Sequence, residues 1–401
     1  MKINLIRYAN SLDPNATYHQ DSERFIEDVN NELFDDDIEL VDDLENSSYS
    51  IIFIETGGSE QKFIKDVDTL PRPFILLSSS MNNSLPACLE IKTYIETVLK
   101  EEVIVLFGEE KDVAESLKRV NKVVLSSLEI KDCNLGVIGK PSDWLIASKV
   151  DYEKAHKKFG LNLIDISTSE LKEEIDKGLI KNIPHQKELL NKYDKEVLDV
   201  ALKIYSGLKR IIDKYRLKGF TLRCFDLIEE YKNTACLAFA LLNEEGIIAA
   251  CEGDVPSLLT MMLVKQATGQ SSFMANPSRI DILKGNILFS HCTLPLNMCR
   301  EYELMTHFES GLGIGVRGKL DKKEITITKI TPDLNDILCI SGTIVDNLTL
   351  PNYCRTQISV DIQREEVFDF LKTSFGNHVI ICYGDQLAEI LTLFHFYLDI
   401  K

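Results

Sequence analysis

The sequence predicts an α/β protein in which parallel-sheet units precede a mainly antiparallel β domain. In the first third of the chain, short apolar segments alternate with amphipathic ones, which is typical of a parallel sheet covered by helices on both faces. The same pattern begins again at NLGVIG, residues 134–139. After Gly269 the segments are rich in β-branched residues and separated by Gly, Pro, Asn and Asp, which favours antiparallel strands and a small barrel.

The first domain, residues 1–132, is expected to hold strands and helices in alternation. The predicted strands are KINLIRYA, IELVDDL, YSIIFIET, PFILLSS and VIVLFG. The predicted helices lie around residues 21–30, 60–67, 87–100 and 112–128. The turn GGSE, residues 57–60, leads from a strand into a helix. It is either an ordinary βα turn or a place where backbone N–H groups contact an anion or a sugar hydroxyl.

The second domain, residues 133–268, is expected to combine NLGVIG with the strand LNLIDIS and a long helical stretch at 186–218. GIIAA, residues 246–250, is short and apolar without a helical period, which predicts a buried strand. SLLTMMLVKQATG follows Pro256, and this order predicts a helix with proline in its first turn and Gly269 beyond its end.

The third domain, residues 269–401, reads as strands separated by turns. The segments that predict strands are NILFSHCTLP, EITITKITPDL, DILCISGTIVDN and TQISVDI. One helix is expected near residues 385–397. GLGIGVRG, residues 311–318, contains the G-x-G-x-x-G spacing of phosphate-binding loops. A strand pattern follows it where such a loop requires a helix, so a turn or bulged strand is favoured.

The charge balance excludes two classes of partner. The formal net charge is −18, with 45 Lys and Arg against 63 Asp and Glu. A chain without a basic surplus cannot neutralise phosphates, so we expect neither a nucleic-acid nor an anionic-membrane partner.

A cytoplasmic protein is expected from the apolar segments and the cysteines. MKINLIRYAN turns polar too soon for a signal peptide, and no apolar run approaches the roughly 20 residues that span a bilayer. The 10 cysteines include no C-x-x-C pair, and most of them lie in apolar segments. This pattern favours buried reduced thiols over disulfides or a zinc site.

Two acids stand where the predicted strand GIIAA meets the helix after it, in the run ACEGDVPSLLTMML. A strand-to-helix turn is where an open α/β sheet places its ligand sites. Asp254 alone would be explained as a helix N-cap. Capping gives no reason for Glu252 beside the end of a buried strand, so the pair Glu252 and Asp254 is a candidate site.

Further polar residues cluster in the last third of the chain. FMANPSRID places Asn276 and Arg279 on an expected proline-containing loop, and His291 ends an apolar segment. His307 and His378 lie in THFESGLG and GNHVIICYGD. His291 is either a core histidine or a ligand, and His307 is either functional or a solvent-facing strand residue. His378 stands at the entrance of a strand, where a functional role is favoured.

The ordered motifs ACEGDVPSLLTMML, FMANPSRID, THFESGLGIGVRG, NYCRTQ and GNHVIICYGD resemble the L-fucose isomerase and L-arabinose isomerase superfamily, in particular its fucose isomerase-like members. The resemblance covers about the last 180 residues, from RCFDLIEEY onward. It implies two Rossmann-like α/β domains followed by a β-barrel domain, assembled into homotrimers or hexamers. It also implies a divalent metal, usually manganese, held by a Glu, an Asp and a His that bind an open-chain sugar.

Carried onto this chain, the resemblance makes Glu252 the family's Glu and His378 its His, while Asn276 stands where the Asp is expected. Aldose–ketose isomerisation passes through an ene-diol and needs acid–base groups together with a Lewis acid. An amide oxygen can bind a hard metal but carries no proton at neutral pH. Glu252 is therefore the expected ligand and base, Asn276 a third ligand, and Asp254 the partner acid, with Asp281 or Glu309 as alternatives.

Two functional hypotheses follow from these residues. In the first, the chain is a metal-dependent isomerase of a fucose- or arabinose-like sugar. Substrate contacts are then expected from four residues, Arg279, His291, Arg317 and Arg355. In the second, Asn276 marks a non-catalytic relative that binds a sugar and regulates another process. The cost of burying an unpaired carboxylate favours the enzyme.

Overall fold

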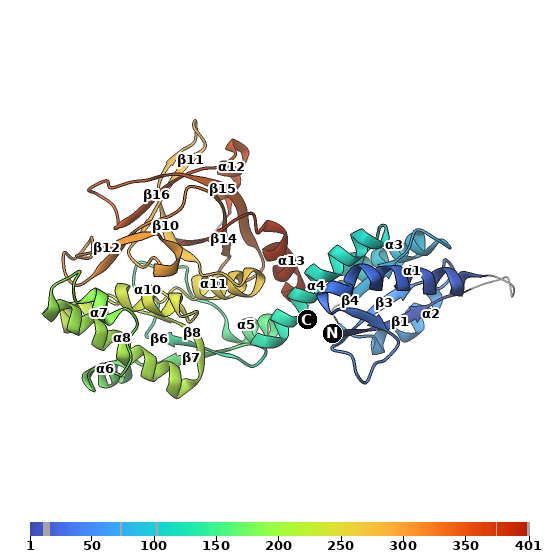
Figure 1. Ribbon diagram of the computed structural model, residues 1–401, viewed down its shortest axis with the longest axis horizontal. Helices are drawn as coiled ribbons and strands as arrows, with labels where there is room; N and C mark the ends of the chain where they lie inside the picture. The colour runs from blue at the N-terminus through green and yellow to red at the C-terminus, as the bar shows by residue number, and fades with distance from the viewer. Residues whose placement is uncertain (11–16, 73, 102, 374, 399–401) are drawn as a thin grey trace. The chain divides into compact units, whose positions relative to one another are not determined.

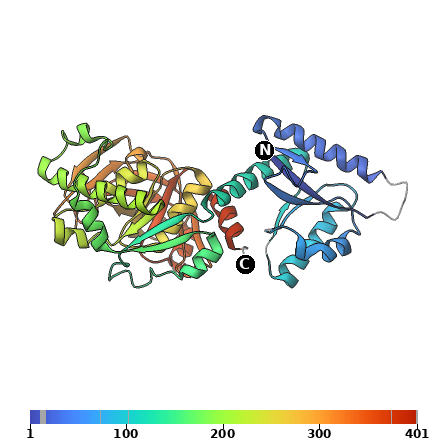
Figure 2. The same ribbon diagram turned by 90° about the horizontal axis from the view of Figure 1, so that it is seen from below.

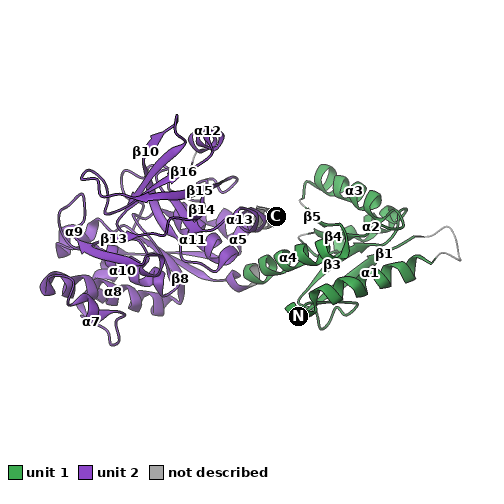
Figure 3. Ribbon diagram, turned by 45° about the horizontal axis from the view of Figure 1, so that its top comes forward, with its two compact units in different colours: residues 1–126, 395–401 green, residues 127–394 purple. Residues whose placement is uncertain are grey.

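The computed structural model describes residues 1–10, 17–72, 74–101, 103–373 and 375–398 (Figure 1). The chain forms two compact units (Figure 3), unit 1 with residues 1–126 and 395–401 and unit 2 with residues 127–394. The division falls inside the helix α4, Glu110–Ile130. Unit 2 contains both the second parallel sheet and the β-barrel. The three-domain division at 132 and 268 stays a prediction.

Unit 1 is built on a five-stranded parallel sheet in the order β2-β1-β3-β4-β5. Its strands are β1 Lys2–Tyr8, β2 Glu39–Val41, β3 Tyr49–Ile54, β4 Phe74–Ser78 and β5 Val103–Leu106. Its α-helices, besides α4, are α1 Tyr18–Leu33, α2 Glu60–Asp66 and α3 Ser84–Tyr94. Short helical turns follow three of them, η1 Phe34–Asp36, η2 Val67–Thr69 and the π-helical η3 Ile95–Leu99. Helices cover both faces of the sheet (Figure 2), which confirms the predicted alternation.

The first α/β part of unit 2 is a four-stranded parallel sheet in the order β7-β6-β8-β9. Its strands are β6 Asn134–Ile138, β7 Asn162–Ile166, β8 Leu217–Leu222 and β9 Ile248–Ala250. Its helices are α5 Tyr152–Phe159, α6 Thr168–Asp176, α7 Gln186–Leu189, α8 Lys195–Tyr215, α9 Asp226–Tyr231, α10 Cys236–Glu244 and α11 Val255–Thr268. The predicted strand GIIAA and the helix that ends at Gly269 are confirmed.

The helical stretch predicted over 186–218 is interrupted and ends before residue 218. The segment forms α7, a break, α8 and the first residues of β8. The break is fixed by Asp194, whose Oδ1 accepts hydrogen bonds from the backbone N–H groups of Glu196 and Val197 and so starts a new helix. Arg216 has a left-handed φ of 52° and ends α8 before β8.

The second part of unit 2 is a closed barrel with the strand order β10-β11-β16-β15-β14-β17. Its strands are β10 Phe273–Asp281, β11 Asn286–His291, β14 Glu324–Ile330, β15 Ile337–Asn347, β16 Thr356–Asp361 and β17 Val379–Tyr383. β12 Glu301–Met305 and β13 Gly315–Lys319, which follow the short η4 Leu296–Met298, form a separate two-stranded sheet that packs against β16. The mainly antiparallel barrel is confirmed, and GLGIGVRG runs through a turn into β13 as favoured.

Two predictions about this part are corrected. FMANPSRID is the strand β10 and not a loop, because Phe273 to Ala275 pair with β17, while a register shift between Pro277 and Arg279 accommodates the proline. A second helix, α12 Arg364–Lys372, precedes the expected α13 Leu387–Leu398. It begins with a capping box between Gln363 and Glu366. Among the described residues, no helix is both long and apolar enough to cross a bilayer.

Candidate active site

The two acids between β9 and α11 are held in different environments by the backbone of their turn. Glu252 has a left-handed φ of 63°, and Gly253 has a φ of 73°. A Cβ at Gly253 would lie 2.6 Å from the carbonyl oxygen of Lys140, so the turn requires glycine there. Asp254 caps α11, because its Oδ1 accepts a 2.8 Å hydrogen bond from the backbone N–H of Ser257. The capping role considered for Asp254 is confirmed.

Asp254 is also the centre of a buried charge network. The Nζ of Lys329, on β14, lies 3.0 Å from the Oδ2 of Asp254 and also donates to the hydroxyl of Ser257. The Nδ1 of His378, directly before β17, lies 2.9 Å from the same Oδ2. Burial by itself raises the pKa of Asp254, but the charge of Lys329 and the contact with His378 hold that pKa well below its usual range. An ionised Asp254 keeps a proton on the Nδ1 of His378.

The other nitrogen of His378 faces Glu252. Its Nε2 lies 3.4 Å from the Oε1 of Glu252, and the Nε2 of His291 lies 3.9 Å from the same oxygen. The Nε2 of His378 is buried without a hydrogen-bond partner in the part of the chain that the structure describes. Trp144 donates from Nε1 to the Oε2 of Glu252 at 2.6 Å. The carboxylate of Glu252 thus lies close to the imidazoles of His291 and His378, and the Nε2 of His378 is left without a hydrogen bond.

A buried set of donors that shares Glu252 and His291 with this group could hold a divalent cation. Ligand atoms of Cys251, Glu252 and His291 lie within 4.8 Å of one another, and all three residues are buried. Burial by itself raises the pKa of Glu252, but the contacts with His291 and His378 hold that pKa well below its usual range, so the carboxylate is ionised. Burial lowers the pKa of His291, which keeps its imidazole in the neutral form that binds metals. The buried group could therefore hold a metal ion.

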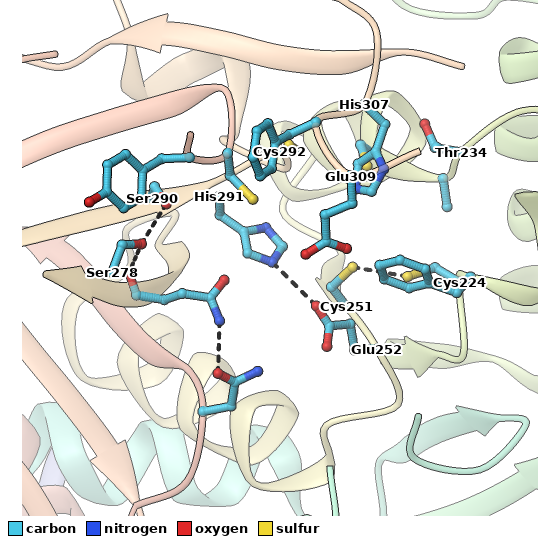
Figure 4. A pocket seen from close by; sticks show the side chains of 18 of the residues that line it. Cys224, Thr234, Cys251, Glu252, Ser278, Ser290, His291, Cys292, His307 and Glu309 are labelled. Atoms are coloured by element: carbon cyan, nitrogen blue, oxygen red, sulfur yellow. Dashed lines mark hydrogen bonds and ion pairs between the residues drawn. The ribbon is translucent and has the colours of Figure 1, made fainter. Parts of the chain in front are cut away.

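A pocket of about 500 Å³ opens beside Glu252 (Figure 4). Aromatic side chains, thiols and polar groups line it together. Its lining includes Trp144, Glu252, Asn276, His291, His307 and Glu309. In Figure 4 the carboxylates of Glu252 and Glu309 and the ring of His291 point into the same space. A pocket of this size and mixed lining suits a small polar ligand.

Of the remaining carboxylates considered as a second acid, Glu309 is the one that lines this pocket. Burial, together with the charge of Glu252, raises the pKa of Glu309. Asp281 is paired with Lys284 and lines a separate pocket on the barrel. Asp254 lies behind Glu252 in its network with Lys329 and is not among the lining residues.

Three other predicted residues, Asn276, His291 and His307, line the pocket. Asn276 lines the pocket from β10, and its Nδ2 donates to the Oδ1 of Asn377 at 3.0 Å. His291 and His307 line it too. The alternative of a solvent-facing strand residue is wrong for His307, because its side chain is buried outside any strand. Burial lowers the pKa of His307 to about 4.

The three predicted arginines lie outside the pocket lining. Arg279 lines the separate barrel pocket. Arg317 lies 3.8 Å from the carboxylate of Glu303. The guanidinium carbon of Arg355 lies 5.9 Å from the ring centroid of Phe308, which lines the pocket. Its Nε donates to the carbonyl oxygen of Thr306 at 2.6 Å.

Sequence reasoning missed two residues of this site. Trp144 is 51% exposed, yet its indole N–H is bound to Glu252. It is the single tryptophan of the chain, and only its rarity could have drawn attention to it. Lys329 is a lysine inside the β-branched strand EITITKI, between Thr328 and Ile330, and its side chain is buried. A lysine at an inward position of such a strand signals a buried partner.

Comparison with known proteins finds two sugar isomerases that are similar to this chain in sequence. A sulfoquinovose isomerase of Alkalicoccus urumqiensis is 23% identical over 308 residues, which are 71% of this chain and 68% of that protein. A sulfoquinovose isomerase of Clostridium sp. (strain MSTE9) is 24% identical over 214 residues, 49% of this chain and 46% of that protein. No protein-family model matches the chain.

The two similarities indicate a sugar isomerase. This class of enzyme interconverts aldoses and ketoses, and the hypothesis of an enzyme is thereby favoured over that of a regulatory relative. The ionised Glu252, the neutral His291 and the pocket beside them supply groups that such a reaction uses.

Proposed function

We propose that this chain is a metal-dependent aldose–ketose isomerase whose substrate is sulfoquinovose or a sugar of similar size with a terminal anionic group. The observation that carries the proposal is the buried Nε2 of His378, which makes no hydrogen bond among the described residues and lies 3.4 Å from the Oε1 of Glu252. A buried nitrogen without a hydrogen bond is costly unless a ligand occupies the site. Trimer or hexamer assembly, which the fucose isomerase resemblance implies, stays a prediction.

In this proposal the cation is held by Glu252, His378 and His291, with the amide oxygen of Asn276 as a further ligand. Manganese is the expected ion. When bound, a divalent cation would polarise neighbouring carbonyl and hydroxyl oxygens of the open-chain sugar. The contact between Asp254 and the Nδ1 of His378 orients the ring so that Nε2 is the coordinating nitrogen.

Proton transfer is assigned to two carboxylates whose environments shift their pKa values in opposite directions. The pKa of Glu252 is lowered by its histidine contacts despite burial, so it is ionised and can remove the proton at C2 of the aldose. The pKa of Glu309 is raised by burial and by the charge of Glu252, so it is the better proton donor. The two residues line one pocket, where an ene-diol would form between them. Glu309 replaces Asp254 as the partner acid in this scheme.

The substrate class rests on the names of the relatives and on one arginine. Sulfoquinovose is a hexose that carries a sulfonate at its end. The guanidinium of Arg355 lies 5.9 Å from the ring centroid of the pocket residue Phe308, and the planar, charged guanidinium group suits a sulfonate or phosphate. We assign the anionic group of the substrate to the side of the pocket near Arg355.

The test is isomerisation by the metal-stripped chain, with and without manganese, of sulfoquinovose, glucose, L-fucose and L-arabinose. We expect manganese-dependent conversion, preferentially of sulfoquinovose, and a fall of at least about 1000-fold in kcat for Glu252→Gln, since both base and ligand charge are lost. Glu301→Gln, an exposed substitution on the hairpin strand β12, is the matched control and should leave the rate unchanged. Full activity in Glu252→Gln would refute the assignment.

Asn276→Asp tests the departure from the family pattern. The two side chains have the same shape, and the introduced carboxylate would add a ligand charge in a pocket where Glu252 is already ionised. We expect manganese to bind about 10-fold more tightly, measured by titration calorimetry, because one more anionic oxygen neutralises the cation. An unchanged affinity would show that Asn276 does not contact the metal.

A further inference from the structure

Unit 1 has a pocket of its own at the point where the strand order of its sheet reverses. In the order β2-β1-β3-β4-β5, the chain leaves β1 toward β2 on one side and leaves β3 toward β4 on the other. In open parallel sheets, the crevice at the carboxyl ends of two such strands is the usual place for a ligand. Here a pocket of about 430 Å³ lies at that place, lined by Arg7, Tyr8, Ala9, Tyr18, His19, Glu55, Lys62, Lys65 and Asp66.

The floor of this pocket is a buried carboxylate that is only half satisfied. Glu55 follows β3 directly, and its side chain is 1% exposed. Its Oε1 accepts a 2.9 Å hydrogen bond from the Nη1 of Arg7. Its Oε2 is buried and has no hydrogen-bond partner within the described residues, the Nδ1 of His19 being 3.7 Å away. A buried carboxylate oxygen without a hydrogen bond is costly, so the site favours a ligand that donates one from a hydroxyl or another donor group.

The arginine beside Glu55 is already engaged by protein carboxylates. Besides Glu55, Arg7 contacts Asp42 at 2.8 Å and Glu23 at 3.0 Å. Its charge is therefore neutralised locally and is not the group that would recognise an anion. The pocket still offers a cationic side, because Lys62 and Lys65 stand three residues apart on α2 and are both exposed. The Nζ of Lys62 donates a hydrogen bond to the carbonyl oxygen of Ala9, which also lines the pocket.

The lining thus combines a carboxylate acceptor, two lysines and aromatic rings. Tyr18 and His19 lie with ring centroids 4.1 Å apart at the start of α1. A carboxylate binds the hydroxyl groups of a sugar, and an aromatic ring packs on the C–H face of the sugar ring. Ammonium groups bind a terminal oxyanion. A neutral apolar molecule would leave the Oε2 of Glu55 unsatisfied, and an anion without hydroxyls would place charge beside that carboxylate.

We propose that unit 1 holds a second small-molecule site, separate from the pocket beside Glu252, that binds a sugar with a terminal sulfonate or phosphate. The hydroxyls of the ligand face Glu55, and its oxyanion faces Lys62 and Lys65. The turn GGSE, residues 57–60, begins two residues after Glu55 and leads into α2, but none of its residues is among those that line this pocket. The proposal does not require that unit 2 catalyses isomerisation.

The experiment uses the full chain carrying Glu252→Gln, so that no ligand is turned over. Calorimetric titration with sulfoquinovose, glucose 6-phosphate and glucose counts all sites. Fluorescence of Trp144, the single tryptophan, reports on the unit 2 pocket alone. We expect a binding event for a charged sugar that leaves the Trp144 signal unchanged. Whichever of sulfoquinovose and glucose 6-phosphate binds more tightly identifies the anion.

Two variants and a control then locate the event in unit 1. Lys65→Glu on an exposed helix position should weaken it at least 10-fold, and Glu55→Gln should do the same by removing the charged acceptor. Lys111→Glu on the exposed start of α4 makes the same charge change in unit 1 and should have no effect. If the isomerase proposal fails while this one holds, one equivalent still binds and Lys65→Glu removes it. The proposal is overturned if every binding event moves the Trp144 signal, if Lys111→Glu weakens binding as much as Lys65→Glu, or if glucose binds as tightly as the charged sugars.

Discussion

Replacing Lys329 by methionine should expose how the buried network supports the site. Methionine keeps an unbranched side chain of similar length and removes the ammonium group. Lys329 and Asp254 are each buried and 3.0 Å apart, so Lys329→Met leaves a buried carboxylate with only the backbone N–H of Ser257 and His378 as partners. Removing one partner of a buried ion pair costs about 3–5 kcal/mol, and we expect a loss of that size in the free energy of unfolding.

The acid limb of the stability curve should change in the same variant. The pKa of Asp254 is below its unfolded value, so Asp254 contributes stability that is present above about pH 4 and is lost as pH falls through the folded pKa. The charge of Lys329 is the largest of the influences that lower this pKa. In Lys329→Met the folded pKa rises toward the unfolded value, so less stability remains to be lost in acid.

Urea unfolding followed by Trp144 fluorescence measures both effects, because the single tryptophan lies in unit 2. The double variant Asp254→Asn/Lys329→Met removes the buried charge together with its partner and should recover part of the loss, since no unpaired carboxylate remains. A loss below about 1 kcal/mol in Lys329→Met, with an unchanged acid limb, would refute the reasoning that this pair is a coupled buried charge.

Two further predictions concern the turn and the pocket wall. Gly253→Ala should lower the free energy of unfolding by about 2 kcal/mol or more, measured in urea, because the added Cβ would lie 2.6 Å from the carbonyl oxygen of Lys140. The variant should also lose isomerase activity, since the shifted turn would displace Glu252. Wild-type stability in Gly253→Ala would contradict the rigid turn. His307, whose pKa burial lowers to about 4, contributes stability that is present above its unfolded pKa of about 6.5 and is lost as pH falls toward 4. His307→Gln should therefore flatten the decline of unfolding free energy between those pH values by at most about 3 kcal/mol, and an equally steep decline would show that another group titrates there.

Local patterns in the sequence predicted most of the fold because they report burial along a single element. Alternation of apolar strands with amphipathic helices predicted the parallel sheets, and the β-branched segments after Gly269 predicted the barrel. The errors fell where short-range signals compete. In 186–218 the helical composition concealed the cap Asp194. In FMANPSRID the proline suggested a loop, although a register shift lets the strand pass it.

The sequence by itself determined that Glu252 and Asp254 stand at a strand-to-helix turn, that Asp254 can cap the helix, and that Asn276 and His378 belong to polar clusters elsewhere. Only the tertiary structure decided what each group does, because ionisation and coordination depend on neighbours that are distant in the chain. Lys329 lies 75 residues from Asp254 and His378 lies 124 residues from it, yet both meet its carboxylate. Barrel closure brings β14 and β17 side by side against α11, and this packing turns a helix cap into the support of His378. The same dependence on neighbours gives Glu309 its place opposite Glu252 and leaves the carboxylate of Glu55 half satisfied in unit 1.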